Sequence, residues 1–415
     1  LAAICVWEGW VDNYRDSTHH GGIICVFRKN WQEMQVKTVQ HGVGEHGKRS
    51  PLTGELACGP ETLTDAELIK NREDMWANLI KNTMDGPYYR ERSGDLAKVT
   101  VPVLSAANWG GQGLHPRGNF EAFTRAAASQ KWLEVHGIEH WTHFYTNYGL
   151  ALQKKFMGHF LKGEKTGWEN MPKVLLQVRH PGEKFVERHE NEWPLARTQW
   201  TKQYLHLDKH TLGDQPPSAE ASVTYAGLGD GVTLMTPPLA QATEITGPIA
   251  AKLWVSSSTR DADLFLIVRA FDPNMKEVVF QGALDPNTPI AQGWLRVSHR
   301  KLDPKLSLPY RPYHTHDQEQ PMQPGTVYEV DVEVWPTCIV LPKGYRLALT
   351  VRGKDYVYPG GPSKGLETLG TQWHGCGPFV HNDPRDRPAD VFGGDVTLYS
   401  GPKHQAHLLL PVIPT

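Results

Sequence analysis

The sequence contains no long apolar run. The longest uninterrupted one, LAAICVW at residues 1–7, is far shorter than the roughly 20 residues that a helix needs to cross a bilayer. No charged segment precedes this run, so it is not typical of a signal peptide either. We interpret it as a core strand and expect no contact with a membrane.

The chain also has little excess of either charge. It contains 43 Lys and Arg residues against 45 Asp and Glu residues, a formal net charge of -2 at pH 7, and the two signs are interspersed. A nucleic acid or an anionic membrane surface would require a basic patch. Neither is therefore expected as the main partner.

Cysteine is scarce as well. The five cysteines are odd in number and widely spaced along the chain: Cys5, Cys25, Cys58, Cys338 and Cys376. This pattern argues against a disulfide framework and favours a reducing compartment, so we expect a cytoplasmic protein. Because no glycine-rich phosphate-binding loop follows a predicted strand, no cofactor is expected.

The 415 residues suggest two or three structural units, and the sequence changes character near residue 170. Before that point, strand patterns alternate with helix patterns, which predicts a parallel sheet covered by helices. The expected strands are 1–7, 99–107 and 131–136, and the expected helices are 118–128 and a later helix that Gly163 ends. In the polar region between the first two strands, Thr64 and Glu67 have the spacing of a capping box.

Beyond residue 170 the sequence consists of short strand patterns separated by Gly and Pro. In TVYEVDVEVW (326–335), apolar residues alternate with acidic ones, which is the period of a strand with one buried face. About nine or ten such strands without a long helix between them predict a β-sandwich or jelly roll.

One histidine has a position typical of a catalytic base. The stretch LEVHGIEH (133–140) predicts a strand that runs into a turn and ends at His140. In an α/β-hydrolase the base lies on the loop after the last core strand, because that loop opens at the same sheet edge as the nucleophile. His136 and His143 are weaker candidates, for which packing or surface hydrogen bonding is the more ordinary role.

A series of segments together resembles a known family. They are VPVLSAANW (101–109), LEVHGIEH (133–140), FMGHFLKG (156–163), NEWPLARTQWTKQYLHLD (191–208), EITGPIAAKLWVSSSTRDADLFLIVRAFD (244–272) and YEVDVEVWPTCIVLPKGYRLALTVRGKD (328–355). In this order they resemble the cocaine-esterase and X-Pro dipeptidyl-peptidase group of serine hydrolases, the CocE/NonD type. The resemblance implies a partial α/β-hydrolase domain at 1–170 with a helical cap at about 11–92, followed by an X-Pro dipeptidyl-peptidase C-terminal-like jelly roll at 171–415.

The resemblance also implies where the nucleophile lies. In such enzymes the serine stands on a Gly-x-Ser-x-x-Gly or Gly-x-Ser-x-Gly turn, upstream of the strand that LAAICVW matches. We therefore expect the serine to lie outside this chain and the chain alone to be inactive. Ser363, in Gly361-Pro-Ser-Lys-Gly365, is a formal match to the turn. Because it follows a Gly-Pro loop rather than a strand, we interpret it as an ordinary turn residue.

The acid of the predicted triad departs from the family pattern. Family members carry Asp in a Trp-x-Asp pattern after the strand that VPVLSAA matches, whereas this sequence has WGG at 109–111. A base histidine needs a partner on its second ring nitrogen, and glycine supplies none. Glu8, just past the first strand, is the candidate acid, because loops at one sheet edge converge. Asn108 and Glu121 are the alternatives, and the predicted catalytic pair is His140 with Glu8.

Three histidine groupings invite a metal interpretation: His19-His20, His314 with His316, and His374-Gly-Cys376 with His381. None reaches the three or four closely spaced ligands of a zinc site, so no metal is predicted from them. Tryptophans of the cap region, Trp7, Trp10, Trp31 and Trp76, either line an apolar acyl pocket or pack the cap onto the core, and packing is the expected use.

The function that the resemblance implies is a serine hydrolase of the ester or amide type, with dipeptidyl-peptidase-like action as one form. Its partner would be a small ester, amide or peptide substrate, and a homo-oligomer remains open. The alternative is a non-catalytic binding or interaction protein, in which the jelly roll is the working part and the hydrolase remnant a scaffold. Ester or X-Pro amide turnover would support the first function, and glycan binding the second.

Overall fold

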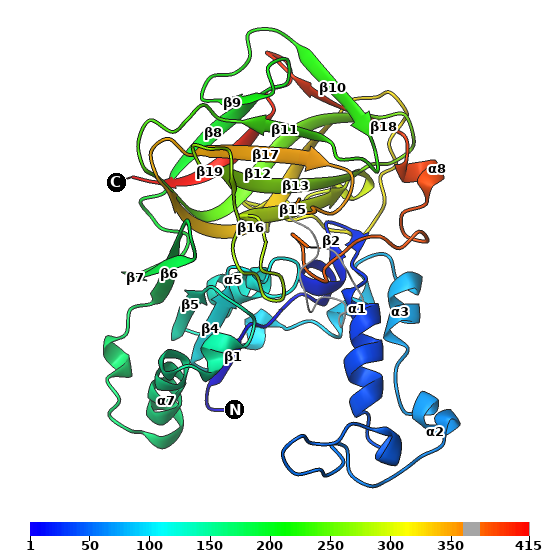
Figure 1. Cartoon of the computed structure of the whole chain (residues 1–415), viewed down its shortest axis with the longest axis vertical. Helices are drawn as coiled ribbons and strands as arrows, with labels where there is room; N and C mark the ends of the chain where they lie inside the picture. Colours follow the sequence, from blue (N-terminus) through cyan, green and yellow to red (C-terminus); the bar gives the residue numbers. More distant parts are fainter. Residues whose placement is uncertain (360–373, 415) are drawn as a thin grey trace.

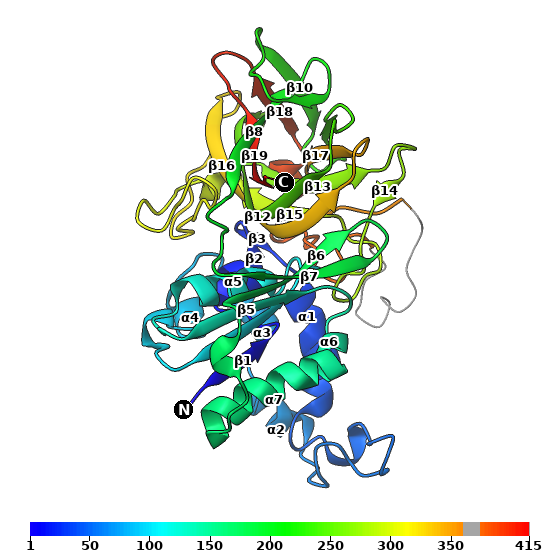
Figure 2. The same cartoon turned by 90° about the vertical axis from the view of Figure 1, so that its left-hand side faces the viewer.

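The structure is a computed structural model that describes residues 1–359 and 374–414. Its α-helices are α1 (Phe27–Trp31), α2 (Asp65–Lys70), α3 (Met75–Lys81), α4 (Pro87–Arg90), α5 (Pro116–Arg125), α6 (Thr142–Tyr145), α7 (Asn147–Lys162) and α8 (Ala389–Phe392). Its strands are β1 (Ile4–Trp7), β2 (His19–His20), β3 (Ile23–Ile24), β4 (Val103–Asn108), β5 (Lys131–His136), β6 (Val174–His180), β7 (Lys184–Glu190), β8 (Gln199–His206), β9 (Thr211–Gly213), β10 (Ala221–Ala226), β11 (Val232–Met235), β12 (Thr243–Ser257), β13 (Asp263–Phe271), β14 (Glu277–Val278), β15 (Ala291–Arg296), β16 (Tyr328–Leu341), β17 (Arg346–Arg352), β18 (Asp395–Ser400) and β19 (His407–Ile413). The strands from β8 onward form a strand-rich half, which lies above a smaller half with helices α1 to α7 (Figure 1 and Figure 2).

The smaller half contains the parallel sheet that the sequence predicts. β1 pairs with β4, β4 with β5, and β5 with β6, all in parallel, and β6 then pairs antiparallel with β7. The residues of β1 are half-buried, whereas the sequence predicts a buried core strand. The reason is its position: among the described strands β1 pairs with β4 alone, which makes it an edge strand.

Local sequence signals define the helices of this half. Thr64 and Glu67 form both hydrogen bonds of the predicted capping box at the start of α2. Gly163 ends α7 in the left-handed conformation (φ 66°), which glycine adopts without a steric penalty. Leu152 and Phe156 of α7 pack on Trp132 of β5, so this helix covers one face of the parallel sheet.

The strand-rich half is a closed, barrel-like sheet. β12 and β16 form its longest antiparallel pair, with a register shift between Gly247 and Ile249. Pairing continues from β16 through β15, β13, β17, β11, β9, β8 and β19 back to β12. The predicted alternation of β16 is confirmed, because Val330, Val332 and Val334 are buried in the core of this half.

The two halves share buried polar contacts. Ile339 of β16 pairs with Arg179 of β6, which joins the two sheets. The buried Arg117 at the start of α5 binds Asp16 at 2.8 Å and Glu333 of β16 at 3.0 Å. Because burial of an unpaired charge is costly, these contacts fix α5 and the segment around Asp16 against the strand-rich half.

Three further expectations concern the chain as a whole. All five cysteines lie in the described residues and are free, as predicted. No helix of residues 1–359 and 374–414 combines the length and the apolar character that crossing a membrane requires. Ser363, the formal match to a nucleophile turn, lies outside the described residues.

Candidate active site

The candidate residues stand at the carboxyl ends of three neighbouring parallel strands. Glu8 directly follows β1, Asn108 is the last residue of β4, and His140 lies four residues beyond the end of β5. The register pairs Trp7 with Ala106 and Asn108 with His136, so these strand ends lie at one edge of the sheet. The convergence of loops that the sequence suggested is therefore present.

Glu8 and His140 are in direct contact. Nδ1 of His140 lies 2.5 Å from Oε2 of Glu8, and because a carboxylate only accepts, the ring N–H donates. The Glu8 side chain is 2% exposed, whereas 33% of the His140 side chain is exposed. The bond fixes the tautomer of His140 and leaves Nε2 as the nitrogen that can accept a proton.

The backbone is in an unusual conformation at Glu8 and in the loop that carries His140. Glu8 (φ 52°) and Ile138 (φ 60°), two residues before His140, lie in the left-handed region, which is costly for side chains of this size. The N–H of Glu8 donates to Ala106 O at 2.7 Å, and the N–H of His140 donates to Ala283 O at 3.0 Å. Asn108 Nδ2 donates to Ile138 O at 2.8 Å, so the β4 end supports the histidine loop.

A second histidine lies behind the pair. Nε2 of His136 donates to Oε1 of Glu8 at 3.1 Å, and Nδ1 donates to Oε2 of Glu134 at 2.8 Å. The hydroxyl of Tyr148 donates to the other Glu134 oxygen at 3.1 Å. Because both ring nitrogens of His136 face carboxylates, the ring is held as an imidazolium.

The charges of this cluster agree with that geometry. Burial acts to lower the pKa of His136, but the carboxylates of Glu134 and Glu8 raise it to about 9. Burial acts to raise the pKa of Glu8, and hydrogen bonds from His136 and His140 outweigh it, so that the pKa lies below its usual value. Glu8 is therefore ionised at neutral pH although it is buried.

The other acid and base candidates have different places. Asn108 lies 3.5 Å from Glu8 but donates its stronger bond to the histidine loop. The Glu121 carboxylate pairs with Arg125 at 2.8 Å and Arg311 at 3.0 Å. At Gly111 a Cβ atom would come within 3.1 Å of a Pro116 side-chain atom and 3.3 Å of Asn108 O, so this turn has little room for a side chain.

His140 and Glu8 line a pocket of about 730 Å³ between the sheet edge and the region of α1. One-third exposure of the histidine ring shows that it reaches this space. Trp7, Trp10 and Trp31 also line the pocket, whereas Trp76 packs against other residues. The remaining lining residues are Phe27, Arg28, Met34, Gln35, Leu114, His115, Glu139, Trp141, Gln281, Ala283 and Leu284.

His115 is a site residue that the sequence analysis missed. Its ring stacks on His140 at 5.0 Å between centroids and 14° between planes, and on Trp10 at 5.7 Å and 9°. Burial and the neighbouring His140 lower the pKa of His115 to about 3, so it stacks as a neutral ring. The sequence signal that could have found it is its position just before Pro116, where α5 begins, because this places it in the loop after β4.

None of the histidines in the three groupings lines this pocket. Nδ1 of His316 is 3.0 Å from Nδ1 of His299, and the backbone oxygen of His314 accepts from Arg15. His20 of the first grouping contacts His381 of the third, a pairing that the sequence analysis did not consider.

Comparison with known families matches more than half of the chain. Residues 166–407 match the X-Pro dipeptidyl-peptidase C-terminal non-catalytic domain. Cocaine esterase of Rhodococcus sp. is 23% identical over 304 residues, which are 63% of this chain and 46% of that protein. The chain thus spans less than half the length of this curated relative.

Solved structures give a longer match. A CocE/NonD family hydrolase from Staphylococcus aureus superposes with a TM-score of 0.83 at 28% identity, over 100% of this chain and 67% of that one. An aminopeptidase from a marine sediment archaeon, Thaumarchaeota archaeon, superposes with a TM-score of 0.68 at 14% identity, over 100% of this chain and 73% of that one. The second likeness concerns the fold alone.

Proposed function

This chain belongs to the CocE/NonD-type hydrolases and carries the X-Pro dipeptidyl-peptidase C-terminal non-catalytic domain, and on this premise we propose that it supplies the base and the acid of a serine hydrolase active site. His140 is the base and Glu8 the acid. The substrate is a small ester or amide, including X-Pro peptides, and the reaction is acyl transfer to water.

The observation that carries the proposal is the hydrogen bond between His140 and Glu8 at the edge of the pocket. It gives the histidine a fixed tautomer and a buried carboxylate that stabilises the imidazolium formed during the reaction. The left-handed backbone at Glu8 is a costly conformation, which fits a residue whose position matters for function.

In the proposed reaction a serine hydroxyl attacks the acyl carbonyl, and its proton moves to Nε2 of His140. The tetrahedral intermediate collapses, and the same proton passes to the leaving alcohol or amine. Water then attacks the acyl-serine ester with His140 again as the base, which releases the acid and regenerates the serine. Glu8 stays ionised throughout and holds the imidazolium through Nδ1.

The serine belongs to a segment outside these 415 residues in this proposal. The described residues that line the pocket include no Ser, Thr or Cys. Within the same proposal, residues 1–170 are a partial α/β-hydrolase domain with a cap at about 11–92. Residues 171–415 are a jelly roll.

A fluorophosphonate probe tests the proposal. We expect the isolated chain to remain unlabelled. In the natural protein that contains these 415 residues, the probe should label one serine outside residues 1–415. Peptide mass spectrometry would identify that serine. In that natural protein His140→Ala should abolish labelling and ester turnover, whereas His143→Ala should retain both. Stoichiometric labelling within the 415 residues would overturn the assignment of the nucleophile.

The non-catalytic alternative gives the opposite result. A binding protein with a hydrolase remnant would show no probe labelling in the natural protein and no change on His140→Ala. Glycan-array binding by the isolated chain would then favour the alternative function.

A further inference from the structure

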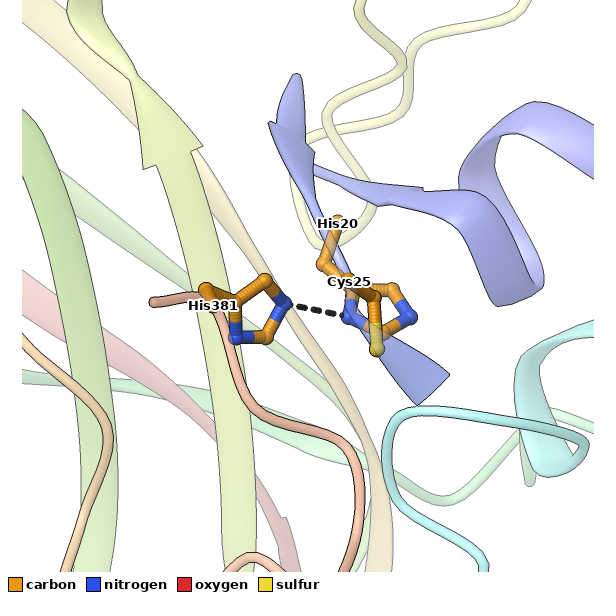
Figure 3. A group of neighbouring side chains, drawn as sticks. All are labelled: His20, Cys25 and His381. Atoms are coloured by element: carbon orange, nitrogen blue, oxygen red, sulfur yellow. Dashed lines mark hydrogen bonds between the residues drawn. The ribbon is translucent and has the colours of Figure 1, made fainter. Parts of the chain in front are cut away.

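A buried cluster of two histidines and a cysteine joins the two halves of the molecule. Nδ1 of His20 lies 2.7 Å from Nε2 of His381, and the Cys25 sulfur completes a group whose ligand atoms all lie within 4.8 Å of one another. Figure 3 shows the hydrogen bond that joins the two histidine rings, with Cys25 next to His20. All three residues are at most 1% exposed.

The outer nitrogens of the two rings face hydrogen-bond acceptors. Nδ1 of His381 lies 2.7 Å from the Asp355 carboxylate, and Nε2 of His20 lies 3.4 Å from the backbone oxygen of Asp16. If each outer nitrogen carries the proton that its acceptor requires, both inner nitrogens hold lone pairs. Two lone pairs facing each other repel, unless a proton or a metal ion lies between them.

We propose that His20, Cys25 and His381 bind a zinc ion. A cation between the two inner nitrogens accepts both lone pairs and leaves each outer N–H free to donate to its acceptor. Two imidazoles and a thiolate are ligands that zinc prefers, and the Asp355–His381 bond is the outer contact that orients a zinc-bound histidine.

Only a small movement is required to place the ion. Zinc–nitrogen bonds of about 2.0–2.1 Å in tetrahedral geometry separate two nitrogens by about 3.3 Å. The inner nitrogens are 2.7 Å apart, so the rings must separate by about 0.6 Å.

The surroundings fit a structural ion. Trp294 packs on both histidine rings, with 4.8 Å between its ring centroid and that of His20 and 5.6 Å to that of His381. Cys25 is 0% exposed, and a negatively charged sulfur at that depth needs a cation beside it. Closed, buried sites of this kind stabilise a fold rather than bind substrate.

The position of the cluster gives the ion a definite role. His20 and Cys25 belong to the β2–β3 hairpin and the residue after it, whereas His381 lies in the strand-rich half. Phe27 and Arg28, at the start of α1, follow Cys25 closely and line the candidate substrate pocket. The ion would therefore fix one wall of that pocket to the strand-rich half.

Metal analysis of the purified chain tests the site. After loading with Zn²⁺ and passage over a chelating resin, we expect about one zinc ion per chain by elemental analysis. Loading with Co²⁺ should give a thiolate-to-cobalt charge-transfer band in the near ultraviolet. Cys25→Ser should lose this band, and Cys338→Ser, which changes another fully buried thiol, should keep it. Asp355→Asn should weaken zinc binding about 10- to 100-fold.

If a variant fails to fold, measurements on the wild-type chain alone still test the zinc site. Removal of zinc with a strong chelator should lower the melting temperature, and Zn²⁺ but not Mg²⁺ should restore it. A zinc content far below one equivalent after loading, a cobalt spectrum without the thiolate band, or the same band in Cys25→Ser would overturn the proposal. A pair of histidines joined by a hydrogen bond would then remain.

Discussion

The buried imidazolium of His136 predicts a loss of stability at alkaline pH. Its ring lies between Glu8 and Glu134, which raise its pKa to about 9 against the opposing effect of burial. A histidine in an unfolded chain has a pKa of about 6.5. Because the folded pKa is the higher one, the folded state binds the proton more tightly. The stabilisation is complete below about pH 6.5 and is lost as the pH rises through about 9.

The size of the effect follows from the two pKa values. The difference between about 9 and 6.5, at roughly 1.4 kcal/mol for each pKa unit, gives about 3.5 kcal/mol for the whole titration. Solvent screening reduces this little, because the His136 side chain is 1% exposed. A domain whose total stability is about 5–15 kcal/mol would show such a change clearly.

Urea unfolding of the isolated chain measures the loss. The free energy of unfolding is compared between about pH 6.5 and about pH 9.5 for the wild type and for His136→Gln, which cannot carry the charge. Other groups that titrate in this range affect both proteins. We expect the wild type to lose about 3 kcal/mol more than the variant. Parallel losses in the two proteins would refute the charged state of His136.

Three further changes test other parts of the molecule. In the natural protein, Glu8→Gln should lower kcat about 100- to 10,000-fold by ester assay, and the exposed Glu45→Gln should leave it within about 2-fold. Arg117→Met should destabilise the chain by about 3–5 kcal/mol in urea, because Asp16 and Glu333 lose their buried partner. Thr64→Ala should remove the α2 cap, about 1 kcal/mol, and speed hydrogen exchange of the α2 amides.

The sequence predicted the parallel sheet because its strands and helices follow local rules. β5 has the predicted bounds, and Gly163 ends α7 as expected. The half-buried state of β1 differs from the expectation of a buried core strand, since among the described strands it pairs with β4 alone. The pairing of the short strands β10 and β11 was not predictable, because their partners β18 and β17 lie far away in the sequence.

The contact between Glu8 and His140 could be anticipated from the sheet rule alone. Both follow strands that run in parallel, so their loops meet at one edge. The roles of His136 and Glu134 could not be anticipated, because a histidine inside a strand gives no sign of which carboxylates face it. Likewise His20 and His381 lie 361 residues apart, and only the folded chain brings them together.

Within the proposed function, Glu8 supplies the acid that the glycine at position 111 lacks. The turn after β4 leaves little room for a side chain at Gly111, so an acid cannot stand there without moving Pro116. An acid after β1 must cross a further strand spacing to reach the histidine loop, which favours the longer glutamate over aspartate. The left-handed backbone at Glu8 turns that side chain toward His140. His136 then compensates the buried charge, which a carboxylate at this depth requires to stay ionised.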